Sequence, residues 1–239
     1  MAKLSIEEGL SVVVHEIKNS LAGILMGLQM LKSEVGENEL LENILEEVER
    51  LFALTRDTIT LSLPLDLELK ENSIPEIIRG SFEVVKPEID EKNVTIALEF
   101  PDKFPPVLCD AEKMKSVFIN LISNAVHYSP NGGKICLGGE YLGNNMVRIW
   151  IKDEGPGMKQ NELDAIFRKF YTKRQGGMGV GLALVHKVVY EHFGVIDVES
   201  EPGKGTRFII TMPTDFHFVE RRRGRDRRSG QDRRKRRYL

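Results

Sequence analysis

His15 and Glu16, a histidine followed by a carboxylate, are the first residues whose types could do chemistry. An imidazole beside a carboxylate can lose a ring proton and act as a nucleophile. Asn19, four residues on, lies on the same helix face as His15. It also stands where the zinc motif H-E-x-x-H needs its second histidine, and a carboxamide is a poor zinc ligand. A lone histidine on a helix is more often a solvated surface residue, so these three residues need support from elsewhere in the chain.

Two further groups of residues have the chemistry to bind a nucleotide. Asn120 and Asn124 stand one turn apart on a helix predicted over residues 110–128, and their carboxamide oxygens suit a Mg²⁺ ion that also binds phosphate. Asp153 directly follows a predicted strand, where its carboxylate can accept a hydrogen bond from an adenine amino group. Gly155 and Gly157 let the backbone pass close to a flat ring. Each group alone is weak, because such turns and asparagine pairs are common.

A glycine-rich stretch enters a helix predicted over residues 180–193. Glycines at 177, 179 and 181 would let backbone N–H groups and the helix N-terminus face phosphates. The spacing excludes a Walker A loop and the dinucleotide motif G-x-G-x-x-G. The sequence Gly203-Lys204-Gly205-Thr206 makes a tight turn between the last two predicted strands, and a purely structural role explains it at least as well.

Apolar residues at alternating four- and three-residue steps predict two helices, from about residue 5 to 34 and from about 41 to 62. The seam residues are Leu10, Val14, Ile17, Leu21, Ile24, Leu28, Leu31 and Val35 in the first helix and Leu41, Leu45, Val48, Phe52, Thr55, Ile59 and Ser62 in the second. One hairpin cannot cover both seams, so two chains are expected to pair as a four-helix bundle. Residues 1–65 are therefore predicted to form a homodimerising antiparallel hairpin.

From about residue 66 the pattern changes to helices alternating with strands. Helices are predicted over 73–91, 110–128 and 180–193, with Ser73 and Asp110 as caps of the first two. Strands are predicted at 94–100, 134–140, 146–153, 195–199 and 206–212. This order predicts a two-layer α/β sandwich over residues 66–216, and the whole chain is expected to be an α+β protein.

The composition, with 41% hydrophobic residues in 239, suits one or two ordinary globular domains. The only cysteines, Cys109 and Cys136, form no C-x-x-C pair, which favours a reducing cytoplasm and no structural metal. No apolar run is long enough to span a membrane, and the first residues do not resemble a signal peptide.

Charge is distributed unevenly along the chain. Residues 220–239 hold 11 Lys and Arg against 3 Asp and Glu, whereas residues 1–219 hold 23 against 33. The segment 217–239 repeats an acid-Arg-Arg unit every six residues, with glycines between, and is predicted to be disordered when free. It is either a solvated tail without a partner or a binder of an anionic one: membrane, nucleic acid or a cyclic dinucleotide.

In their order, these motifs resemble the boxes of sensor histidine kinases of bacterial two-component systems. His15–Leu21 (H-E-I-K-N-S-L) resembles the phosphoacceptor box, and Asn120–Ser129 (N-L-I-S-N-A-V-H-Y-S) resembles the Asn box. The other boxes are matched by Asp153–Gly157, Phe167–Phe170, Gly177–Leu182 and Gly203–Thr206. The resemblance spans about residues 3–213 and implies a dimerisation and histidine-phosphotransfer hairpin followed by a Bergerat-type ATP-binding domain.

The resemblance implies that ATP phosphorylates His15, with Glu16 as acid/base partner, before transfer to an Asp of a response-regulator receiver domain. It implies that Asn124, and with it Asn120, binds Mg²⁺ and phosphate, and that Asp153 binds adenine. The other residues it implies for ATP binding are His127, Tyr128, Gly155, Gly157, Gly177, Gly179, Gly181, Leu182 and Thr206. Asn19 completes E-x-x-N, which resembles the family motif that orients water for dephosphorylation of the partner. A phosphatase activity is therefore also expected.

Three features depart from the usual pattern of the family. Ser20 replaces a proline, so the helix should bend less after the phosphoacceptor. His127 stands where a lysine commonly contacts ATP phosphates, which removes a permanent positive charge. The lid between Phe170 and Gly177 is short and resembles that of a short-lid subgroup. Lys173 or Arg174 is expected to supply the missing charge.

The sequence leaves two other classes of function open. One is a phosphorelay transfer protein that has lost ATP binding, although the intact Asp153 and the glycines at 177–181 argue against it. The other is an ATP-binding regulatory protein of the same fold, such as an anti-sigma factor, although the predicted hairpin argues against it. Because the hairpin begins close to Met1, the signal is expected to come from a separate sensor protein, unless the sequence is a piece of a longer chain.

Overall fold

The computed structural model describes residues 2–36, 38–45, 47–48, 51, 61, 65–173 and 179–215. The chain divides into two compact units, one made of Met1–Asp66 with Phe167–Leu184 and the other of Leu67–Ile166 with Val185–Leu239. Within the described residues no helix is both long and apolar enough to cross a membrane.

A single long helix, α1 (Ala2–Val35), carries the predicted phosphoacceptor box, and residues 39–45 and 47–48 are again helical. In the second helix the seam residues Leu41 and Leu45 are buried. In α1 the seam is divided: Leu21 and Leu28 are half-buried, whereas Ile17, Ile24 and Leu31 are 43%, 51% and 44% exposed. Val48 is half-buried, and the remaining predicted seam positions lie outside the residues whose side chains are described. Among the described residues, part of the predicted apolar surface of the hairpin therefore stays exposed.

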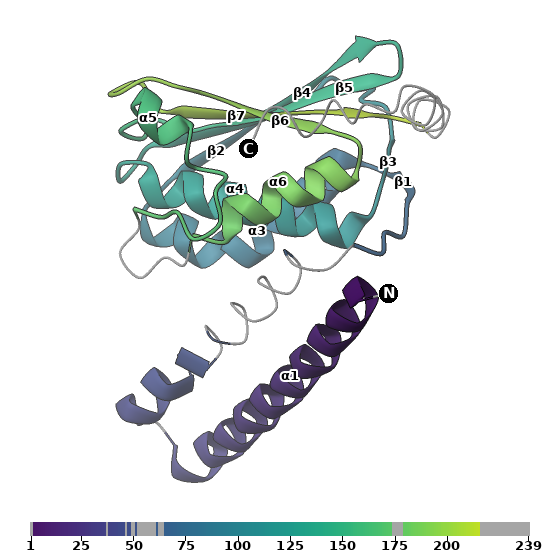
Figure 1. Ribbon diagram of the computed structural model, residues 1–239. Helices are drawn as coiled ribbons and strands as arrows, with labels where there is room; N and C mark the ends of the chain where they lie inside the picture. The colour runs from purple at the N-terminus through teal and green to yellow at the C-terminus, as the bar shows by residue number, and fades with distance from the viewer. Residues whose placement is uncertain are drawn as a thin grey trace. The chain divides into compact units, whose positions relative to one another are not determined.

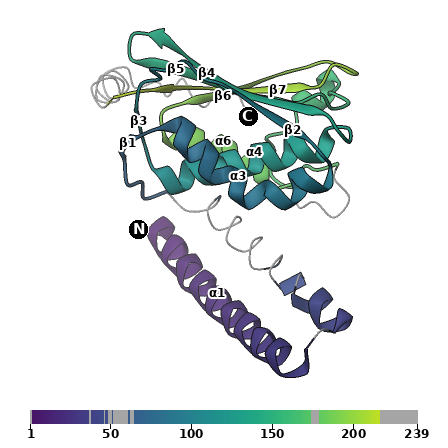
Figure 2. The ribbon, with the colours of Figure 1, turned by 180° about the vertical axis from the view of Figure 1, so that it is seen from behind.

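The second unit is built on a five-stranded sheet in the order β2-β4-β5-β7-β6. Its strands are β2 (Thr95–Glu99), β4 (Lys134–Gly143), β5 (Met146–Lys152), β6 (Val195–Ser200) and β7 (Thr206–Pro213). β2 and β4 are parallel, and the other neighbours are antiparallel. Figures 1 and 2 show the helices α3 (Ile74–Glu91), α4 (Ala111–Tyr128) and α6 (Gly181–Glu191) along one face of this sheet. The predicted two-layer sandwich is confirmed.

The core lies between the sheet and these helices because apolar residues alternate along the strands. In β4 and β5, Ile135, Leu137, Ile149 and Ile151 are at most 1% exposed, while the residues between them face away. On α4 the buried residues recur at helical spacing: Met114, Val117, Phe118, Leu121, Ile122, Ala125 and Val126. This packing leaves the face of α4 that carries Asn120 and Asn124 only half-buried.

The prediction for the two helix caps is half correct. Asp110 caps α4 as predicted, since its Oδ1 accepts a hydrogen bond from the backbone N–H of Lys113 at 3.1 Å. Ser73 occupies the N-cap position of α3, but its side chain makes no capping hydrogen bond, and the prediction of a serine cap is wrong in that respect. Pro75 in the first turn needs no hydrogen-bond partner for a backbone N–H, which reduces the demand for a cap there.

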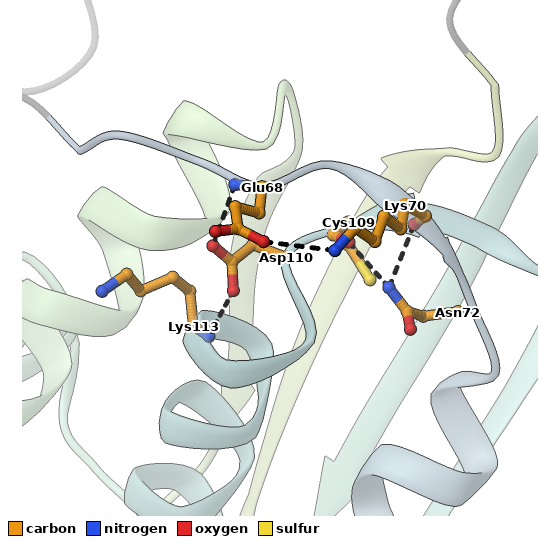
Figure 3. A network of polar contacts seen from close by, with 6 residues as sticks. All are labelled: Glu68, Lys70, Asn72, Cys109, Asp110 and Lys113. Atoms are coloured by element: carbon orange, nitrogen blue, oxygen red, sulfur yellow. Dashed lines mark hydrogen bonds and ion pairs between the residues drawn. The ribbon is translucent and has the colours of Figure 1, made fainter.

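Three short elements were not predicted: β1 (Lys70–Asn72), β3 (Val107–Cys109) and α5 (Gln160–Leu163). β1 and β3 pair antiparallel beside the sandwich, and side chains reinforce the pair (Figure 3). Asn72 donates to the carbonyl oxygens of Lys70 at 3.0 Å and of Cys109 at 2.8 Å, and Asp110 Oδ2 accepts from the backbone N–H of Glu68 at 3.2 Å. The same aspartate therefore caps α4 and holds the segment that leads into β1.

Candidate active site

Asp153 follows the last residue of β5 and is buried, with 4% of its surface exposed. Its Oδ1 accepts hydrogen bonds from the backbone N–H groups of Gly155 at 2.8 Å and Thr206 at 3.1 Å. Burial raises the pKa of this carboxyl, and the two backbone hydrogen bonds oppose the rise. Among the described residues Oδ2 receives no hydrogen bond, so this oxygen is the one left to accept from a ligand.

Glycines hold the backbone around Asp153 close to the turn between β6 and β7. A Cβ on Gly157, at φ +66°, would collide with the carbonyl oxygen of Glu201, and one on Gly205, at φ +80°, would collide with the carbonyl oxygen of Asp153. The N–H of Gly203 donates to the carbonyl of Pro156 at 2.7 Å. Of these glycines, Gly157 was predicted to let the backbone pass close to a flat ring, and a side chain there would meet the protein's own backbone at Glu201.

Ser200, at the end of β6, ties the same two segments together and was missed from the sequence. Its Oγ accepts from the N–H of Met158 at 2.9 Å, donates to the carbonyl of Gly205 at 2.8 Å and lies 3.0 Å from Thr206 Oγ1. A serine at the end of a strand has no distinguishing sequence pattern, so nothing local signals this role.

The asparagines predicted to bind the metal lie on the half-buried face of α4. Asn120 donates through Nδ2 to the carbonyl of Ser116 at 2.9 Å, which leaves its Oδ1 as the group for a cation. Asn124, one turn later, is also half-buried. Among the described residues no group of three or more His, Cys, Asp or Glu side chains could hold a metal ion.

The C-terminal turn of α4 brings His127 and Tyr128 next to the Asp153 segment. Their rings pack edge to face with centroids 4.8 Å apart, and Tyr128 is 41% exposed. A Cβ on Gly155 would lie 2.9 Å from the carbonyl oxygen of Tyr128 and 2.8 Å from Asp153 Oδ1. Gly155 therefore allows the end of α4 to pack against the Asp153 turn.

Part of the predicted phosphate loop is described, within the other unit. The N–H of Phe170 donates to the carbonyl of Gly179 at 2.8 Å, and both residues have positive φ, +66° and +65°. A Cβ on Gly179 would collide with the backbone of Phe170 and lie 2.6 Å from the N of Tyr171. Gly181 begins α6, Leu182 is half-buried and Lys173 is exposed. Arg174 and Gly177 lie outside the described residues.

The phosphoacceptor box lies within α1, which continues through Ser20 without a break. Asn19 and Ser20 are exposed. The side chains of His15 and Glu16 lie outside what the structure describes, so their predicted roles stay predictions.

An open depression of about 570 Å³ lies on the sheet face away from the helices and contains none of the predicted site residues. Trp150 lies across Gly138 on its floor, with the guanidinium of Arg207 5.1 Å from the ring centroid. Four carboxylates and four cations share its wall: Glu99, Glu154, Glu199, Glu201, Lys134, Lys152, Lys204 and Arg207.

Comparison with known proteins gives a match for each of the two predicted domains. Residues 109–215 match the family described as histidine kinase-, DNA gyrase B- and HSP90-like ATPase, and residues 6–64 match the His Kinase A (phospho-acceptor) domain. The chain is 34% identical over 212 residues to sporulation kinase E of Bacillus subtilis (strain 168), covering 88% of this chain but 29% of that relative. The chain thus spans less than a third of the length of that curated relative.

Solved structures of histidine kinases share the fold. Full-length ShkA in complex with AMPPNP has a TM-score of 0.77 and 25% identity, covering 86% of this chain and 45% of that one. The histidine kinase ThkA in complex with the response regulator protein TrrA has a TM-score of 0.63 and 24% identity, covering 90% and 64%. The second unit is thus an ATPase domain of the class that histidine kinases share. With the match to the phosphoacceptor domain before it, the chain is similar to the sensor histidine kinases over both domains.

Proposed function

We propose that this chain is an ATP-dependent histidine autokinase that phosphorylates His15 and passes the phosphoryl group to an Asp of a response-regulator receiver domain. The observation that carries the proposal is the geometry of Asp153. Two backbone N–H groups occupy Oδ1 and leave Oδ2 to accept a hydrogen bond from the adenine amino group. Both a phosphoacceptor domain and an ATPase domain are matched in this chain. The two matches argue against a phosphorelay transfer protein without ATP binding and against an anti-sigma-like protein without a phosphoacceptor.

The phosphate end of the site would use α4 and the glycine loop. Asn124, together with the free Oδ1 of Asn120, suits a Mg²⁺ ion that bridges to phosphate oxygens. Gly179 and Gly181 lead into α6, whose N-terminal N–H groups suit an anion. We assign the lid to the short-lid subgroup, in which Lys173 or Arg174 supplies the charge that His127 does not provide permanently.

In the transfer step, a ring nitrogen of His15 forms a bond to the γ-phosphorus of ATP while the bond from that phosphorus to the bridging oxygen breaks, releasing ADP. Glu16 takes the ring proton as the N–P bond forms. Most of the catalytic effect in such transfers comes from positioning and from neutralising charge on the phosphoryl oxygens. A site made of two asparagines, a glycine loop and a lid cation can supply both.

The receiver partner and a second activity follow from the same helix. The ThkA structure contains a response regulator, and we infer the same class of partner for this chain. Asn19 is exposed on α1, four residues after His15, where a carboxamide could orient water toward a phosphorylated receiver. This supports phosphatase activity beside kinase activity.

The exposed seam residues Ile17, Ile24 and Leu31 support a homodimer, because a second hairpin would cover them. A separate sensor protein, a cytoplasmic location and an anionic partner for residues 217–239 remain proposals from the sequence. Truncation after residue 218 should leave autophosphorylation intact and remove binding to anionic liposomes, DNA or cyclic dinucleotides. Unchanged binding to all three would leave the tail without a partner among them.

The proposed function is tested by incubating the protein with γ-labelled ATP and Mg²⁺ and then with a panel of receiver domains. We expect an acid-labile, alkali-stable label that moves to one or a few receivers. His15→Gln should abolish the label and leave ATP binding unchanged. Labelling that persists in His15→Gln, at His127, His186, His192 or His217, would contradict the assignment.

A further inference from the structure

One lysine on α3 holds the end of α4. Lys92 is the C-cap residue of α3 and is half-buried. Its ammonium donates to the carbonyl oxygens of Val126 and Ser129, each at 3.1 Å, and also to that of His127. All three ammonium hydrogens are therefore used on the last turn of α4 and the residue after it.

The sequence explains why this end of α4 needs a donor. A helix leaves its last carbonyl groups without partners. The carbonyl of Val126 would normally accept from the N–H four residues later, but residue 130 is proline and has none. The loop that follows is held on the same residue, because the N–H of Gly132 donates to the carbonyl of Lys92 at 2.9 Å. Lys92 thus replaces the missing partner and fixes both the turn and the loop.

The ammonium also has an electrostatic effect. The C-terminal end of a helix carries about half a negative charge, which repels an anion. Among the described residues no carboxylate pairs with Lys92, so its positive charge is offset only by carbonyl dipoles. This end of α4 carries Asn124, His127 and Tyr128, and His127 provides no permanent charge of its own.

We propose that Lys92 is a positioning residue for the nucleotide phosphates: it fixes the last turn of α4 and reverses the unfavourable charge at that helix end. The proposal rests on the nucleotide binding proposed above. It makes Lys92 act through α4 and not by contact with the nucleotide. The affinity lost without Lys92 should therefore grow with the number of phosphates on the ligand.

Three substitutions separate the two roles. Lys92→Met removes the donors and the charge, Lys92→Gln keeps N–H donors without charge, and Lys92→Arg keeps both. Lys86→Met is the matched control, because Lys86 is exposed on the same helix. Affinities for adenosine, ADP and ATP with Mg²⁺ are measured by calorimetry. Hydrogen exchange of the amides over 127–133, measured without nucleotide, shows whether Lys92 holds the end of α4.

We expect Lys92→Met to weaken ATP binding about tenfold, the size of a partly buried charge acting at a helix end, and ADP binding less. Adenosine binding should change little. Exchange over 127–133 should rise in Lys92→Met, less in Lys92→Gln, and stay near wild type in Lys92→Arg, which should also restore ATP affinity. Lys86→Met should match wild type throughout.

Equal losses for adenosine, ADP and ATP, or an ATP affinity in Lys92→Gln equal to wild type, would overturn the electrostatic role. Unchanged hydrogen exchange in Lys92→Met would show that Lys92 does not fix the last turn of α4. If the wild type binds no nucleotide, the proposed function fails, and the exchange measurement still decides whether Lys92 holds α4.

Discussion

The ATPase domain and the helical hairpin cover their apolar residues in different ways. In the ATPase domain the strands β4 and β5 bury their inward isoleucines and leucines almost completely, with at most 1% exposed. In the hairpin Leu41 and Leu45 are buried, but Ile24 remains 51% exposed. The first region completes its core within one chain, whereas the described part of the second leaves apolar seam residues exposed, as the proposed homodimer requires. We therefore expect substitutions in the first to affect nucleotide binding and folding, and those in the second to affect assembly and phosphoryl chemistry.

The largest effect within the ATPase domain should come from Asp153→Asn. The amide oxygen can still accept from Gly155 and Thr206, but its NH₂ group would face the adenine amino group, a donor against a donor. Leaving such buried groups unpaired costs about 3 kcal/mol, so ATP affinity should fall about 100-fold by calorimetry.

The fold should tolerate Asp153→Asn well. Burial raises the pKa of Asp153 above its ordinary 3.8, so the folded domain binds this proton more tightly than the unfolded chain does. Its stabilising contribution is present below pH 3.8 and is lost as the pH rises through the raised pKa. At pH 8 the asparagine variant should therefore unfold at the same or a higher temperature than wild type. A large fall in melting temperature would show that the carboxylate is needed for folding and not for adenine.

In the hairpin, Asn19→Ala should reduce dephosphorylation of the receiver about tenfold while largely sparing autophosphorylation, because one hydrogen bond that orients the attacking water is worth roughly 1.4 kcal/mol. Asn19 is exposed and can hold a water, but its carboxamide transfers no proton to or from His15. The measurement is decay of label on the cognate receiver, with Ser20→Ala, exposed at the next position, as the control. Equal loss of both activities would point instead to partner docking.

The same comparison predicts a change of assembly without a change of nucleotide binding. Ile24→Glu places a charge on the exposed half of the seam and should weaken the dimer about tenfold or more, because a charge without a partner is costly to bury. Light scattering over a concentration series measures this. Leu142→Glu, on a leucine that is 39% exposed in β4, should leave the mass and the ATP affinity unchanged. If the wild-type chain stays monomeric at high concentration, the exposed seam of the hairpin is not a dimer surface.

Local patterns were enough to predict the long elements of both regions, because the helices and the inward residues of the strands repeat at fixed steps. Contacts that join distant segments were not predictable in the same way. Ser200 reaches Met158, Asp110 reaches Glu68, and Lys92 reaches the end of α4. Each contact depends on how separate segments pack, which no single stretch of sequence encodes. The glycines around Asp153 illustrate the same limit, since the sequence indicates a need for space but not what fills it.

The smallest predicted effect is the pH dependence of the stability of the ATPase domain, which involves the buried His192. His192, 1% exposed, accepts from the N–H of Asp110 through Nε2 at 3.0 Å, and its Nδ1 lies 2.7 Å from the carbonyl of Val188. Burial lowers the pKa of His192 below 6.5, although the Val188 carbonyl and the carboxylates of Asp110 and Glu191 oppose the shift. Burial also lowers the pKa of His186.

Because protonation of His192 would remove the acceptor for the N–H of Asp110, its neutral form stabilises the start of α4 and the segment before β1. This contribution is present above pH 6.5 and is lost as the pH falls through the lowered pKa. In urea titrations from pH 8 to pH 5, wild type should lose up to about 1.4 kcal/mol per pH unit for each such histidine below 6.5. His192→Gln should be less stable at pH 8 and show a shallower slope, with His186 accounting for what remains. An identical slope in wild type and variant would mean that the hydrogen bond to Asp110 does not depend on the charge of His192, and that the acid sensitivity of this domain arises elsewhere.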